Sequence, residues 1–145
     1  MRTVLRWMLA LVAGTAMFAA HAQAQREGPV KVVYHLNQGN EQASAAIRNM
    51  RNHLDADPTA QIVVVTHGPG IDFLLDGAKD RNGNPYDALV QDLKGRKVEF
   101  RVCRNTLQGR KLPDSAVIPE ATIVPSGVAE VARLQAKEGF AYVRP

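Results

Sequence analysis

The chain has a single cysteine, Cys103, and it stands at a position where a thiol could be reactive. It follows the segment 98–102, in which apolar and polar residues alternate with the period of a β-strand. Asn105 or Thr106, just beyond it, is suited to cap a following helix. A thiol beside a helix start and near cationic side chains ionises more readily than an ordinary thiol. We therefore predict a functional thiolate at Cys103, and we keep open the alternative of a buried, inert cysteine.

Side chains that could support this thiol stand at the ends of other predicted strands. His67 follows the segment 61–66 and could serve as a base or hydrogen-bond partner, or it could only cap local backbone. Asn37 and Asn105 are short amides that could orient a ligand or cap helices. Positive charge near the thiol would come from three arginines: Arg101, Arg104 and Arg110. The candidate site is therefore Cys103 with His67, Arg104, Asn105 and Asn37 in support.

A metal or cofactor site has less support in the sequence. His35 lies within the first predicted strand, where packing explains it, although with His67 and Cys103 it would suit a soft metal such as Cu(I) or Zn(II). These residues lack the close spacing of a local metal motif. Gly39 and the segment 68–70 match no phosphate-binding fingerprint. We therefore expect no bound cofactor and keep soft-metal binding through His67 and Cys103 as an alternative.

Strand-like and helix-like segments alternate along the chain after residue 28. This alternation predicts an α/β fold in three layers, α/β/α, with a five-stranded parallel sheet. In such open sheets ligands bind beyond the carboxyl ends of the strands, which is where the candidate site falls. The predicted strands are 29–36, 61–66, 98–103, 121–124 and 140–143.

The helices between these strands have recognisable start signals and apolar faces. Asn40, Asn84 and Ser126 are predicted to cap the helices that follow them, and Gly139 to end the last helix. The apolar face of that last helix is predicted to consist of Val128, Val131, Ala132 and Leu134.

The first 24 residues have the pattern of a secretory signal peptide. Arg2 and Arg6 precede an apolar run, 8–20, that is too short for a comfortable membrane span. Small residues then favour cleavage after Ala24, with Ala22 as the alternative site. We expect residues 25–145 to form one domain that functions in the periplasm, without stable membrane insertion once the leader is removed.

The overall composition excludes one class of partner. The 145 residues carry a net charge of +4, of which the two arginines of the leader contribute +2. So small a positive balance, with aromatic residues at 6%, does not favour nucleic-acid binding. A single cysteine also rules out a disulfide within the chain, so the core must hold the fold.

Several segments together resemble the DsrE/DsrF-like family, in particular its small exported members. The resemblance covers nearly all of the chain after the leader, and it implies the same three-layer fold. It also implies small homo-oligomers, trimers or hexamers, and a cysteine that carries sulfur as a persulfide, a role that maps onto Cys103. The segments are 32–36, 65–68, 102–107, 123–128 and 134–145, and they include Cys-Arg-Asn-Thr-Leu and Pro-Ser-Gly-Val.

Three functions follow from these observations. The first is a sulfur carrier or thiol protein in sulfur relay or oxidation, which would be a sulfurtransferase-like component. Its partners would be sulfur-donating and sulfur-accepting proteins or small sulfur compounds. The second is a binding module that uses the same strand-end pocket for a small molecule or a protein without covalent chemistry. The third is the soft-metal protein described above.

Overall fold

A single parallel sheet organises the chain. The computed structural model describes residues 28–145, and their five strands pair in the order β4-β3-β2-β1-β5, all parallel. The predicted α/β fold with a five-stranded parallel sheet is therefore confirmed. The strands are β1 (Lys31–Leu36), β2 (Gln61–Thr66), β3 (Glu99–Cys103), β4 (Ala121–Val124) and β5 (Ala141–Val143).

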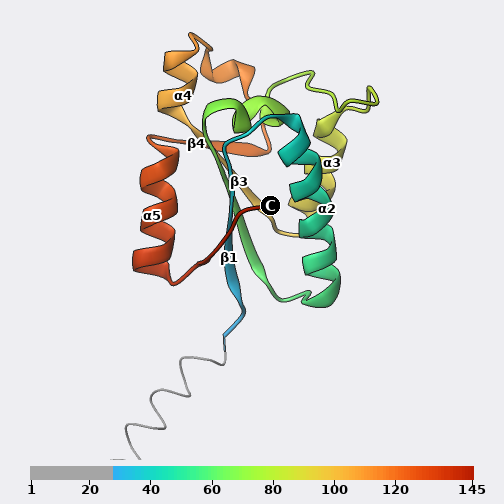
Figure 1. Ribbon diagram of the computed structural model, residues 1–145, viewed down its shortest axis with the longest axis vertical. Coiled ribbons are helices and arrows are strands. Elements are labelled where there is room, and N and C mark those ends of the chain that lie inside the picture. The colour runs from blue at the N-terminus through green and yellow to red at the C-terminus, as the bar shows by residue number, and fades with distance from the viewer. Residues whose placement is uncertain (1–27) are drawn as a thin grey trace, which may run out of the picture.

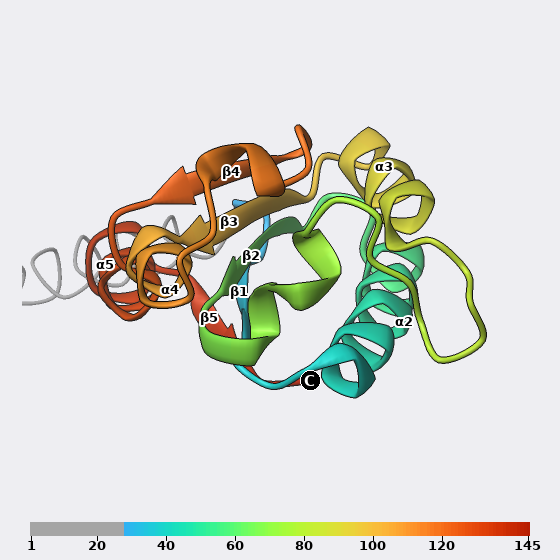
Figure 2. The same ribbon diagram turned by 90° about the horizontal axis from the view of Figure 1, so that it is seen from above.

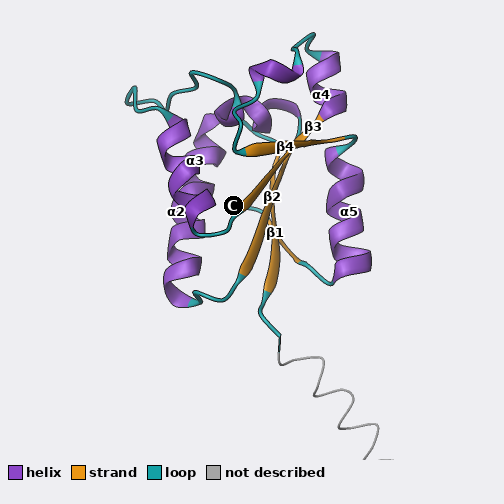
Figure 3. Ribbon diagram, turned by 180° about the vertical axis from the view of Figure 1, so that it is seen from behind, coloured by secondary structure: helices purple, strands orange, loops and turns teal. Residues whose placement is uncertain are grey.

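Helices lie on both faces of this sheet, which gives three layers (Figure 1). Two long helices, α2 (Asn40–Ala56) and α3 (Tyr86–Gly95), cover one face, and α5 (Gly127–Glu138) covers the other. Figure 3 shows the same separation from behind. Shorter segments follow the carboxyl ends of the strands or connect them: the 3-10 helix η1 (Gly68–Leu74), α4 (Arg104–Gly109) and the 3-10 helix η2 (Asp114–Ala116).

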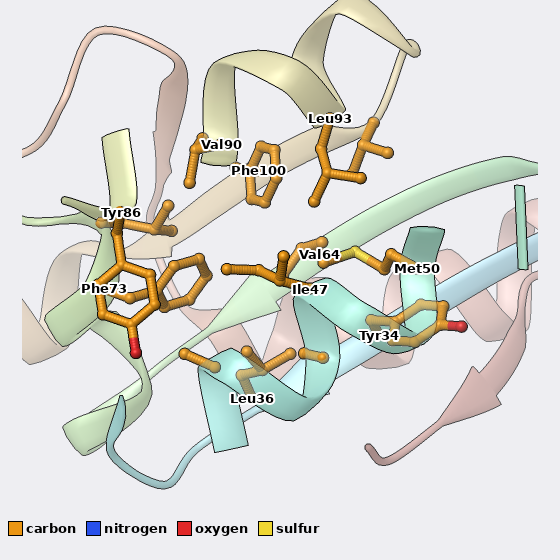
Figure 4. Close-up of a cluster of buried hydrophobic side chains, with 14 of the residues drawn as sticks. Tyr34, Leu36, Ile47, Met50, Val64, Phe73, Tyr86, Val90, Leu93 and Phe100 are labelled. Carbon is orange, nitrogen blue, oxygen red and sulfur yellow. The ribbon is translucent and has the colours of Figure 1, made fainter. Parts of the chain in front are cut away.

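The larger core lies between the sheet and the helices α2 and α3. Side chains that alternate along β1, β2 and β3 point into it, among them Tyr34, Val64 and Phe100. Met50 of α2 and Leu93 of α3 are fully buried against them, as Figure 4 shows. Burial of this apolar surface is the main stabilising term of the fold.

The opposite face has a smaller core beneath α5. It comprises Val33, Val63 and Val65 from the strands, Val131 and Leu134 from α5, and Phe140 just before β5. By the same alternation His35 of β1, His67 after β2, and Arg101 and Cys103 of β3 belong to this face. The candidate site therefore lies on the α5 side of the sheet.

The boundaries of some elements differ from the sequence prediction. The strands β2 and β4 have the predicted limits, whereas β1, β3 and β5 start two, one and one residues later than expected. The differing residues are all at strand starts, where the side-chain pattern alone does not define the first residue.

Two of the predicted helix caps are wrong. Gly39 is the N-cap of α2 and Pro85 that of α3, so Asn40 lies inside its helix and Asn84 lies before the cap. The Asn84 side chain instead donates to Asp80 Oδ2 in the preceding loop, at 3.0 Å. Asparagine favours turns as well as caps, and Asn84 stabilises a turn here.

The predictions for the ends of α5 are confirmed, and the prediction for its apolar face is partly wrong. Ser126 Oγ accepts a hydrogen bond from the Ala129 amide, and Gly139 ends the helix with a φ of +74°. Val131 and Leu134 are buried as predicted, whereas Val128 is 59% exposed and Ala132 is also exposed. The sheet therefore covers only part of the apolar face of α5.

In the described part of the chain, none of the helices combines the length and hydropathy that a membrane span requires. The expected signal peptide, residues 1–24, lies outside the described residues.

Candidate functional site

Cys103 is the last residue of β3 and the N-cap of α4, so the thiol stands at the junction of a strand and a helix. This position corrects the expectation that Asn105 or Thr106 caps the helix, because α4 already begins at Arg104. Only 5% of the residue's surface is exposed. Seen from above, α4, β3 and the start of α5 come together at the carboxyl edge of the sheet (Figure 2).

The surroundings of this thiol favour its ionised form. Burial raises the pKa of Cys103, but hydrogen bonds to the thiolate outweigh it and lower the pKa below its usual value. The donors are the backbone N–H of Gly127, the hydroxyl and N–H of Thr106, and the N–H of Asn105. Backbone donors of two helix N-termini, α4 and α5, therefore converge on one sulfur.

Gly127 brings the start of α5 against the ends of the strands. A Cβ atom on Gly127 would lie 3.1 Å from the Thr66 carbonyl oxygen and 3.2 Å from the Cβ atoms of Cys103 and of His67. Such contacts are tighter than a side chain normally tolerates, so the absence of a side chain lets the helix approach. These contacts also show that Cys103 and His67 are immediate neighbours.

Thr106 connects the cysteine turn to the turn that follows β2. Its Oγ1 accepts a hydrogen bond from the Gly68 amide at 3.0 Å while the same hydroxyl donates to the sulfur. Neither Thr106 nor Gly127 was predicted as part of the site. The sequence indicates Thr106 only as a possible helix cap, and Gly127 only as part of the segment 123–128.

His67 belongs to a chain of three hydrogen-bonded side chains. Its Nε2 lies 2.7 Å from Nε2 of His35, and Nδ1 of His35 lies 2.8 Å from the hydroxyl of Tyr142. His67 follows β2, whereas His35 lies in β1 and Tyr142 in β5, and these three strands are neighbours in the sheet. His35 therefore does more than pack within its strand, and Tyr142 is a site residue that sequence reasoning missed.

The surroundings of both imidazoles favour their neutral form. Burial is the main cause that lowers the pKa of His35, with smaller contributions from the positive charges of His67 and Arg144. Burial likewise lowers the pKa of His67. Neutral histidines can act as general bases and can exchange a proton between their two ring nitrogens.

The three arginines expected to stabilise the thiolate have other partners. Arg104 Nη1 donates to both carboxylate oxygens of Asp114 at 2.9 Å. Arg101 pairs with Glu99 and Glu130. Arg110 pairs with Asp72. None of these guanidinium groups is a cause of the lowered pKa of Cys103. Backbone and hydroxyl donors stabilise the thiolate instead of the expected cationic side chains.

The two amide candidates occupy different places. Asn105 has an exposed side chain, and its contribution to the thiolate comes from its backbone N–H. The Asn37 amide donates from its backbone to Gln42 Oε1 at 2.9 Å, and its carbonyl oxygen faces Gly68. Within residues 28–145 its buried Oδ1 has no hydrogen-bond partner. Asn37 thus lies by α2 and η1, apart from the donors around the sulfur.

A shallow cavity of about 480 Å³ lies next to Thr106, and Cys103 is not among its lining residues. Thr106 and Gly68 form part of its wall, together with Pro69, Asp72, Gly109 and Arg110. Thr106 thus contacts both the sulfur and a space large enough for a small molecule or a peptide side chain.

No group of three or more His, Cys, Asp or Glu side chains suited to hold a metal ion occurs within residues 28–145. His35 and His67 face each other at hydrogen-bonding distance, so their Nε2 atoms are too close together to hold an ion between them.

A buried thiol at the carboxyl edge of a five-stranded parallel sheet, between two helix starts, defines the class of protein. Residues 31–145 match the model of the DsrE/DsrF-like family, and the chain belongs to this family.

Comparison with solved structures supports the same conclusion. A protein of unknown function from Methanobacterium thermoautotrophicum, MTH1491, is 30% identical with a TM-score of 0.71, covering 80% of this chain and 99% of that one. The YchN protein of E. coli shares the fold at 13% identity and a TM-score of 0.63, covering 81% of this chain and 99% of that one. Comparison with curated proteins found no match.

Proposed function

We propose that this protein is a sulfur carrier in which Cys103 holds a sulfur atom as a persulfide. The observation that carries the proposal is the convergence of four donors from Asn105, Thr106 and Gly127 on one buried sulfur, which lowers its pKa despite burial. A thiolate is the nucleophile in sulfur transfer, and a persulfide anion would use the same donors.

The chemistry requires two exchanges at sulfur. The Cys103 thiolate attacks the outer sulfur of a donor persulfide, so a new S–S bond forms and the donor's S–S bond breaks, releasing the donor thiolate. An acceptor thiolate then attacks the outer sulfur on Cys103, and Cys103 leaves as a thiolate. No electron carrier is needed, because sulfur passes between partners at the same oxidation level.

The decisive measurement is the intact mass of the protein after incubation with polysulfide. We expect one added sulfur atom per chain, removed by dithiothreitol and absent from Cys103→Ser. If the unmodified protein gains no sulfur and its thiol is inert to iodoacetamide, the carrier proposal fails. Binding without covalent chemistry would then explain the cavity beside Thr106 better.

We also propose where and with what the carrier functions. The pattern of residues 1–24 supports export to the periplasm, which N-terminal sequencing of the mature protein would test through cleavage after Ala24 or Ala22. Its partners would be sulfur donors and acceptors, either proteins or small sulfur compounds. Exposed aliphatic side chains at Val30 and Val128 support self-assembly into a small homo-oligomer.

A further inference from the structure

A continuous row of hydrogen-bonding side chains runs across the sheet to the neighbourhood of Cys103. Tyr142 is 43% exposed, and its hydroxyl contacts Nδ1 of His35 at 2.8 Å. His35 and His67 then meet through their Nε2 atoms at 2.7 Å, and the Cβ atoms of His67 and Cys103 both border Gly127. The row thus has one end at the surface and the other at the end of β2, which adjoins the end of β3 that carries Cys103.

The contact between the two imidazoles restricts where their protons can be. A neutral imidazole carries one N–H, and a hydrogen bond between two Nε2 atoms needs the proton on one and not on the other. If His35 donates, its Nδ1 accepts from Tyr142 and His67 carries its proton on Nδ1. If His67 donates, His35 Nδ1 donates to Tyr142 and Nδ1 of His67 is bare. The row therefore has two arrangements that differ by one proton at His67 Nδ1.

We propose that Tyr142, His35 and His67 form a proton relay that serves sulfur transfer at Cys103. The proposal rests on the sulfur-carrier function above. In it His67 is the group that exchanges a proton with the sulfur partner, and His35 and Tyr142 are positioning residues that act through His67. Nε2 of His67 contacts His35, which leaves Nδ1 as the ring nitrogen for this exchange, and the Cβ atoms of His67 and Cys103 both lie 3.2 Å from a Cβ placed on Gly127.

Loading of sulfur starts from the arrangement in which His35 donates to His67. As the Cys103 thiolate forms its S–S bond and the donor S–S bond breaks, the departing donor thiolate takes the proton from His67 Nδ1. His67 Nε2 then takes the proton of His35 Nε2, and His35 Nδ1 takes the hydroxyl proton of Tyr142. Water at the exposed tyrosine replaces that proton, so one proton enters at the surface and one leaves with the donor thiol.

Delivery of sulfur starts from the arrangement in which His67 donates to His35, and it restores the original proton positions. The acceptor thiol gives its proton to the bare His67 Nδ1 and attacks the outer sulfur on Cys103. The proton of His67 Nε2 passes to His35, that of His35 Nδ1 passes to Tyr142, and the tyrosine releases one proton to water. Over both steps the row neither gains nor loses a proton.

A reaction that needs no proton provides the test. Alkylation of Cys103 by iodoacetamide expels iodide, whereas loading from glutathione persulfide expels a basic alkyl thiolate. His35→Asn retains an amide that can donate and accept but cannot pass a proton on. We expect His35→Asn and Tyr142→Phe to load sulfur at least about tenfold more slowly, since acid–base assistance is typically worth ~10²–10⁴-fold, while alkylation keeps its rate.

The matched control is His53→Asn. His53 also pairs with a tyrosine, Tyr34, at 3.1 Å, but Tyr34 packs in the core on the α2 side of the sheet. This variant should load sulfur and react with iodoacetamide at the unmodified rates.

Other results would separate a failure of the relay from a failure of the carrier. If His35→Asn and Tyr142→Phe load sulfur at the unmodified rate, or slow loading and alkylation equally, the relay is wrong while the carrier stands. If the unmodified protein takes up no sulfur, the carrier itself fails and the relay with it. Should His35→Asn not fold, Tyr142→Phe at its exposed position answers the same question.

Discussion

The hydroxyl of Thr106 does two things that a methyl group cannot. It donates to the sulfur of Cys103, and its oxygen accepts the amide proton of Gly68. A hydrogen bond to a charged group is worth about 1.5–3 kcal/mol, more than a neutral one. The ionisation of the thiol and the position of the turn after β2 therefore depend on the same atom.

Thr106→Val removes this hydroxyl with little change of shape. We expect the pKa of Cys103 to rise, because a donor to the thiolate is lost, and alkylation by iodoacetamide near neutral pH to slow roughly tenfold, as the loss of one charged hydrogen bond implies. Rates measured across a range of pH check this, with Thr106→Ser as the control that keeps the donor. An unchanged rate in Thr106→Val would show that the backbone donors suffice.

The two histidines make the stability of the fold depend on pH in a defined direction. Burial lowers the pKa of His35 and His67, so below about pH 6.5 the unfolded chain binds protons that the folded chain resists. Their stabilising contribution is complete above that pH and is lost as pH falls through this window. Carboxylates with lowered pKa, such as Glu130, act only at lower pH.

We accordingly expect the urea midpoint to fall between about pH 7 and about pH 5.5, which spans the ordinary histidine pKa. The double variant His35→Gln and His67→Gln should show a flatter dependence, because its side chains do not titrate. Equal slopes for both proteins would mean that the histidines titrate alike in the folded and unfolded chains.

At the scale of elements, the approach of α5 to the strand ends sets the geometry of the site. Gly127→Ala adds a Cβ 3.1–3.2 Å from Thr66, Cys103 and His67. We expect a loss of about 1–3 kcal/mol in the free energy of unfolding from overpacking, and slower alkylation as the Gly127 N–H moves off the sulfur. Urea unfolding and iodoacetamide rates measure the two effects.

The control is Gly95→Ala at the end of α3, where an added Cβ meets nothing within 4 Å. It should leave the alkylation rate unchanged and should not destabilise the protein, since alanine favours helix by up to ~1 kcal/mol over glycine. Equal behaviour of the two variants would refute the tight contact at Gly127.

The elements were readable from the sequence because their signals are local. The β-branched run 61–66, the helix start at Ser126 and the helix end at Gly139 depend on near neighbours only. The site was readable only in part, because Cys103 and His67 occupy predictable strand ends but their partners come from distant segments. The residues around Gly127 and Tyr142 do not indicate that these two belong to the site. The pairing of Arg104 with Asp114 depends on the conformation of the loop between them, which sequence periodicity does not predict.

At the scale of the whole molecule, the two faces of the sheet are covered unequally. The helices α2 and α3 bury the larger core. The core beneath α5 has only six residues, two of them from α5, and Val128 of the same helix is exposed. Apolar side chains left in water favour association.

We expect light scattering with size-exclusion chromatography to give a mass of three or six chains. Val128→Glu should shift that mass toward the monomer, because it puts a charge where the apolar contact would be. Lys137→Glu, a charge change at an exposed position of the same helix, should leave the mass unchanged. A monomeric unmodified protein would show that assembly is not a property of this chain.

The strand order determines when the surroundings of Cys103 can form during synthesis of the chain. The strand β5, near the end of the chain, pairs with β1 near the start of the described residues, and between them lie the segments that surround the sulfur. The donor from Gly127 and the contact from Tyr142 cannot form until these residues have been synthesised. Until then Cys103 lacks a donor that helps to lower its pKa, so the thiol gains its full acidity only when the last segments fold against the sheet.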